Sequence, residues 1–62
     1  MKLIRLTDSL GYLVALVPSK IVGITYDPET DQTYIITEHQ GTISINGNMA
    51  EVYIERVEAC LK

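Results

Sequence analysis

The chain has 62 residues, 47% of them hydrophobic, with one cysteine and one histidine. A chain of this length forms at most one small domain, which buries only about 60% of the surface of its unfolded form and is usually stabilised by disulfides, a metal or a partner subunit. Cys60 cannot form an internal disulfide alone, and His39 alone does not make a metal cluster, so we expect no metal and no cofactor, and we expect self-association.

The charge and hydrophobicity of the chain argue against nucleic acid and membranes as partners. Eight acidic and five basic residues give a net charge of −3, so a general clamp for nucleic-acid phosphates is not expected. Residues 1–26 carry +2 and residues 27–62 carry −5. The longest apolar run, residues 13–17, is far shorter than the roughly 20 residues of a membrane helix. Asp8 lies where a signal peptide would be apolar, so we expect a cytoplasmic protein with no membrane partner.

The first 45 residues predict five β-strands separated by turns. Ile4 and Leu6 alternate with polar or charged residues, which places both on one face of the first strand. Glycine, proline, asparagine and aspartate mark the turns at intervals that suit strands rather than helices. The last three strands predict a meander in which Ile43 and Ile45 face the core. The predicted strands are residues 2–7, 12–17, 21–26, 33–38 and 42–45.

A helix is predicted for residues 49–61. Asn48 suits the N-cap position, and Glu51 follows three residues later, which is the spacing of a capping box. Apolar residues then recur at helical spacing: Ala50, Tyr53, Ile54, Val57 and Leu61. The apolar face of this helix must be buried against a sheet. The sequence therefore predicts the α+β class: a small antiparallel meander of about five strands, as a sheet or partly open barrel, covered by one C-terminal helix.

The predicted strand at residues 12–17 is apolar on both faces. Alternate residues of a strand point to opposite sides, and the sequence leaves open which set faces the core because the register depends on the loop at residues 8–11. One set is Leu13, Ala15 and Val17, and the other is Tyr12, Val14 and Leu16. A single helix covers one face only, so the other calls for a second subunit rather than a ligand cavity. The candidate interface is Leu3, Tyr12, Val14 and Leu16.

The sequence offers no residue for catalysis. His39 falls in a predicted exposed turn, and Cys60 falls in the last turn of the predicted helix, where packing is the expected role. The carboxylates of residues 27, 29, 31 and 38 have the spacing of a calcium loop, but Gln32 occupies the place that such a loop gives to glycine. A solvated hairpin loop is expected instead, and the protein is not expected to be an enzyme.

Several segments carry a pattern found in known families: Ile4-Arg5-Leu6, Pro18-Ser19-Lys20-Ile21, Thr33-Tyr34-Ile35-Ile36-Thr37, the Gly41 turn, and Glu51-Val52 with Val57. Over most of the chain this hydrophobic pattern resembles the small FlbD-like proteins, described as flagellar or swarming-motility accessory proteins. From Pro18 onward the chain also looks like the first half of a LytTR-type DNA-binding domain. The basic segment of that family is missing, so the resemblance assigns no residue to base readout.

These observations predict a small, non-enzymatic, homo-oligomeric interaction or regulatory module of a bacterium or phage, whose partner is a second copy or another protein. The alternative is a protein that binds or sequesters nucleic acid or nucleotides. The acidic balance makes nucleic acid the less expected partner. That alternative would use Lys2, Arg5 and Lys20 with the tyrosines Tyr12, Tyr26, Tyr34 and Tyr53.

Overall fold

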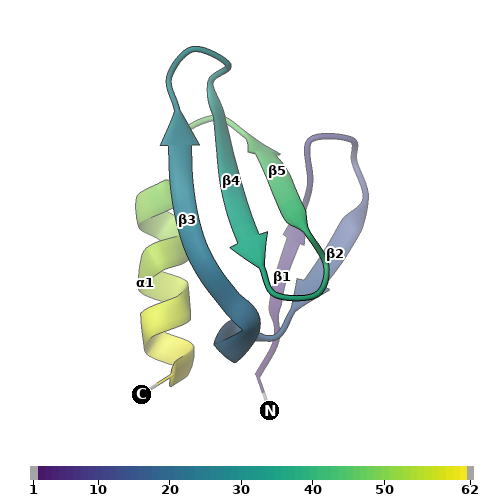
Figure 1. Ribbon diagram of the computed structural model, residues 1–62, viewed down its shortest axis with the longest axis vertical. Helices are drawn as coiled ribbons and strands as arrows, with labels where there is room; N and C mark the ends of the chain where they lie inside the picture. The colour runs from purple at the N-terminus through teal and green to yellow at the C-terminus, as the bar shows by residue number, and fades with distance from the viewer. Residues whose placement is uncertain (1, 62) are drawn as a thin grey trace.

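A computed structural model describes residues 2–61, which form five strands, one 3₁₀ turn and one α-helix (Figure 1). The elements are β1 (Ile4–Thr7), β2 (Leu13–Leu16), η1 (Pro18–Lys20), β3 (Ile21–Asp27), β4 (Gln32–Thr37), β5 (Thr42–Asn46) and α1 (Ala50–Leu61). The predicted α+β class, with antiparallel strands and one C-terminal helix, is confirmed. No helix in the described part of the chain is long and apolar enough to cross a membrane.

The strands divide into two antiparallel sheets. The first is the β1–β2 hairpin, and the second is the predicted meander in the order β3-β4-β5. In Figure 1 the helix α1 and the β1–β2 hairpin both lie behind the three-stranded sheet, α1 next to β3 and the hairpin next to β5. The helix and the hairpin therefore together cover one face of the meander, and its opposite face is open to solvent.

The register of the β1–β2 hairpin decides which face of β2 is buried. Ile4 lies opposite Leu16 and Leu6 lies opposite Val14, so these four side chains share one face. Leu16 is fully buried and Val14 packs against the core. The prediction that Leu16 belongs to an interface is therefore wrong, and Val14 is only partly accessible. The outer face of β2 carries Leu13 and Ala15 instead.

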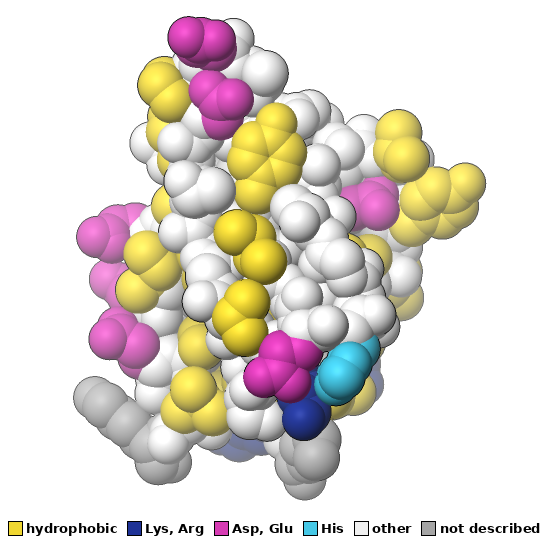
Figure 2. All heavy atoms as spheres, viewed as in Figure 1, with side chains coloured by type: hydrophobic (Ala, Val, Ile, Leu, Met, Phe, Trp, Pro, Cys, Tyr) yellow, Lys and Arg dark blue, Asp and Glu magenta, His cyan; other side chains and the backbone are white. Residues whose placement is uncertain are grey.

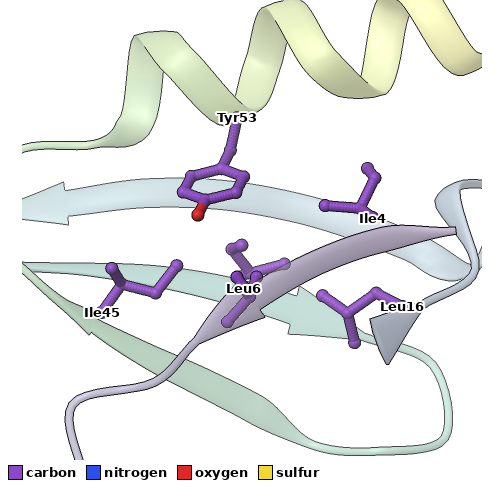
Figure 3. Packing of buried hydrophobic residues seen from close by; sticks show 6 residues of the cluster. Ile4, Leu6, Leu16, Ile45 and Tyr53 are labelled. Carbon is purple, nitrogen blue, oxygen red and sulfur yellow. The ribbon is translucent and has the colours of Figure 1, made fainter. Parts of the chain in front are cut away.

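The core lies where the helix, the hairpin and the meander meet. Its buried hydrophobic members are Ile4, Leu6, Leu16, Ile35, Ile45 and Tyr53. Figure 3 shows Tyr53 pointing from α1 towards Leu6 of β1 and Ile45 of β5. All three layers contribute side chains to one cluster, which is how so short a chain builds a single core.

A buried threonine ties the meander to the start of the helix. The Thr33 hydroxyl donates to the Gly47 carbonyl at 2.7 Å and accepts the Met49 N–H at 2.8 Å. The Tyr53 N–H donates to the Met49 carbonyl at 3.1 Å, which places Met49 at the cap position of α1. The predicted N-cap at Asn48 is therefore wrong by one residue. The N–H of Met49 at the start of the helix is paired with the Thr33 hydroxyl of β4, and not with a side chain of the helix itself.

Candidate interaction surface

The loop between β1 and β2 is closed by its own aspartate. The Asp8 carboxylate accepts the N–H groups of Leu10 at 3.0 Å and Tyr12 at 2.9 Å. Its backbone N–H donates to the Tyr12 carbonyl at 2.9 Å, and its carbonyl accepts the Gly11 N–H at 3.0 Å. Gly11 has a φ of +89°, a conformation that glycine adopts without strain. The loop is thus held in one shape by four hydrogen bonds around Asp8.

This ordered loop presents large hydrophobic side chains to solvent. Leu10 is 80% exposed, Tyr12 66% and Leu13 77%. Figure 2 shows hydrophobic side chains projecting from the molecule at the end of the β1–β2 hairpin. The Ser9 N–H donates to the Ser44 carbonyl at 2.7 Å, so the loop is also fastened to β5. We call Leu10, Tyr12 and Leu13 the hairpin tip.

The hairpin tip overlaps only partly with the predicted interface. Tyr12 belongs to both, and Leu3 is 44% exposed but lines a pocket with Arg56 and Cys60 of α1. Leu10 and Leu13 were not predicted. A signal for Leu10 was present in the sequence, because a leucine between Ser9 and Gly11 stands in a turn where no strand pattern requires it.

An open strand edge runs beside the hairpin tip. Within residues 2–61, β2 pairs only with β1, so the backbone groups on its other side are available for another strand. Asp8 is the only charged residue between Leu6 and Ser19, and its carboxylate is engaged in the loop. The surface is therefore apolar and nearly uncharged.

The basic residues of the alternative hypothesis do not share one pocket. Lys20 lies 3.6 Å from the Glu38 carboxylate and lines a pocket of about 310 Å³ with His39. Arg5 lines another, of about 340 Å³, together with Arg56. The Arg56 guanidinium lies 5.4 Å from the Tyr53 ring centre, and its Nη1 donates to the Arg5 carbonyl at 3.5 Å. Lys2 is exposed and lines neither pocket.

The four tyrosines are also separated. Tyr53 is in the core, and Tyr12 is at the hairpin tip. The Tyr26 hydroxyl donates to the Asp31 carboxylate at 2.6 Å, and this hydrogen bond, with desolvation and the charges of Asp31 and Asp27, raises the pKa of Tyr26 above its ordinary value. Tyr34 donates to the Gln32 side chain at 3.3 Å. Of the two tyrosines of the β3–β4 hairpin, Tyr26 thus lies beside a carboxylate and Tyr34 beside an amide.

The other polar candidates occupy surface positions. His39 is exposed, with Nε2 3.7 Å from the Glu38 carboxylate, and Cys60 is half-buried against the core. The Asp27 carboxylate accepts the Glu29 N–H at 2.9 Å and so closes the β3–β4 turn. Among residues 2–61, no group of three or more histidine, cysteine, aspartate or glutamate side chains lies close enough to hold a metal ion.

No protein family, curated protein or solved structure matches this chain. The resemblances to FlbD-like proteins and to LytTR-type domains therefore stay predictions.

Proposed function

We propose that the protein is a small, non-enzymatic interaction module that associates with a second copy of itself through the hairpin tip. The observation that carries this proposal is that Asp8 holds the loop in one shape while Leu10, Tyr12 and Leu13 stay largely exposed. Ordering the loop in advance lowers the entropy cost of association. Large aromatic and aliphatic side chains on a fixed surface are the usual anchors of protein interfaces.

A second copy fits this surface for two reasons. An open antiparallel edge is self-complementary, so two β2 strands can pair around a two-fold axis and join the two hairpins into one sheet. Asp8 is also the only charged residue between Leu6 and Ser19, and its carboxylate is engaged in the loop, so two copies meet without bringing rows of like charge together.

The hairpin tip exposes enough apolar surface for a dimer interface of standard size. At roughly 150–200 Å² for a fully exposed side chain of this size, the tip exposes on the order of 400 Å² of apolar surface per copy. Since about 57% of an interface is nonpolar, two such tips suit an interface of roughly 1,400 Å², which is within the standard range.

Sedimentation velocity with a mass readout from light scattering tests the proposal over about 1 to 100 µM protein. The wild type should form a dimer within this range, and its thermal midpoint should rise with protein concentration. Leu13→Asp should weaken dimerisation at least about tenfold, because two like charges would meet in an apolar contact.

The matched control is Val22→Asp, which places the same charge at a valine that is 61% exposed on another surface. It should leave the dimer intact. A wild-type chain that stays monomeric at every concentration would refute the proposal, as would a Leu13→Asp dimer as tight as the wild type.

A further inference from the structure

A second apolar surface lies between the edge strand β3 and the helix. It is an open groove of about 230 Å³, lined by residues 21–24 of β3 and by Ile54, Val57 and Glu58 of α1. Val22 is 61% exposed and Ile54 is 38% exposed, so the groove leaves apolar side chains in contact with solvent. We call this surface the β3–α1 groove.

The strand side of the groove has unpaired backbone. In the described part of the chain β3 pairs only with β4, so its other edge is open. Ile21 lies opposite Thr37 and Gly23 opposite Ile36, which leaves Val22 as an extra residue in a bulge. A glycine in a strand leaves room for another backbone to approach, and a Cβ at Gly23 would meet only the Ile36 side chain, at 3.6 Å.

The helix side of the groove is acidic. Glu51, Glu55 and Glu58 are exposed, and no lysine or arginine of residues 2–61 forms an ion pair with them. Figure 2 shows acidic side chains along the edge of the molecule where α1 lies, with hydrophobic side chains between them and the sheet. An apolar groove with an acidic rim favours a ligand that is apolar and positively charged.

We propose that the β3–α1 groove binds an extended segment of another protein in which apolar residues alternate with lysine or arginine. The segment adds to the open edge of β3 as a further strand, which pairs its backbone with that of β3. Its apolar side chains enter the groove beside Val22 and Ile54, and its cations face the glutamates of α1. A second copy of this chain is the poorer occupant, because pairing two β3 edges would bring two rows of glutamates together.

Binding of such a segment to the β3–α1 groove can be tested by titrating the protein with the blocked peptide acetyl-Lys-Val-Lys-Val-Lys-Val-amide and following its amide signals by nuclear magnetic resonance. The expected dissociation constant is on the order of 100 µM, since the groove is small. Amide shifts should concentrate at residues 21–24 and 54–58. The peptide with glutamate in place of lysine should not bind, and the peptide with proline in place of valine should not bind either, because it lacks half of the backbone donors.

Variants separate the groove from general charge attraction. The double variant Glu51→Lys with Glu58→Lys should weaken binding at least about fivefold. The controls Glu29→Lys, in the β3–β4 loop, and Leu13→Asp, at the hairpin tip, should bind as the wild type does. Failure of the lysine-valine peptide to bind at millimolar concentration would overturn the proposal. Shifts centred on the β3–β4 loop, equal binding of the proline peptide, or an unaffected double variant would also overturn it.

Discussion

Thr33 is the residue on which the connection between sheet and helix depends. It is a fully buried polar side chain, and its hydroxyl serves two backbone groups at once, the Gly47 carbonyl and the Met49 N–H. A buried backbone group without a partner costs about as much as a lost hydrogen bond. Thr33 thus acts as a helix cap supplied by a strand that precedes the helix by two elements.

Thr33→Val keeps the shape of the side chain but removes both hydrogen bonds. We expect the free energy of unfolding to fall by about 1–3 kcal/mol, because a partly buried carbonyl and a partly buried N–H lose their partner. The control is Thr42→Val at an exposed position of β5, which should change stability by less than about 0.5 kcal/mol. Urea unfolding followed by circular dichroism measures both, and equal stabilities of the two variants would contradict this role of Thr33.

Tyr26 should give the molecule a pH-dependent signal in alkaline solution. Its raised pKa means that the folded protein keeps the phenol proton over a pH range in which the unfolded chain has released it. The resulting stabilisation is complete below the ordinary tyrosine pKa of about 10 and is lost as pH rises through the raised value. Ultraviolet titration of tyrosinate should show a late component that Tyr26→Phe removes and Asp31→Asn moves to lower pH. A wild-type curve unchanged by either substitution would be inconsistent with this pairing.

At the scale of elements, the sequence was sufficient for strand identity but not for strand orientation. Turn residues and alternating hydrophobicity located every strand to within two residues of its observed bounds. The buried face of β2 could not be predicted, since both faces are apolar and the register depends on hydrogen bonds that Asp8 makes within the loop. The helix start was misplaced for a related reason: Thr33, its capping partner, is distant in sequence.

Two leucines of β2 test that orientation directly. Leu16→Ala should lower the free energy of unfolding by about 2–5 kcal/mol, because Leu16 is fully buried and the substitution leaves a cavity. Leu13→Ala should change it by less than about 0.5 kcal/mol in dilute protein, since Leu13 is exposed, while weakening dimerisation. Thermal unfolding at low protein concentration provides the comparison. The reverse order of the two effects would mean that the other face of β2 is buried.

Charge is distributed unevenly over the whole molecule. Figure 2 shows acidic side chains at the tip of the β3–β4 hairpin and along α1, and lysine and arginine side chains at the opposite end. The hairpin tip lies apart from both groups, with Asp8 as its only charge. The sequence already differs in charge between residues 1–26, at +2, and residues 27–62, at −5. The fold in addition separates in space an apolar surface suited to a second copy from an acidic rim suited to a cation.

This distribution leads to a prediction about nucleic acid. Fluorescence anisotropy with single-stranded and duplex oligonucleotides should show no binding tighter than roughly tens of micromolar at physiological salt, because few cations can contact phosphates at once. Lys20 is paired with Glu38, and Tyr26 donates to a carboxylate that would repel a phosphate. Arg5 and Arg56 are the remaining basic pair that lines one pocket. Submicromolar binding with a steep salt dependence, lost in Arg5→Ala or Arg56→Ala, would make the nucleic-acid alternative the better account of this protein.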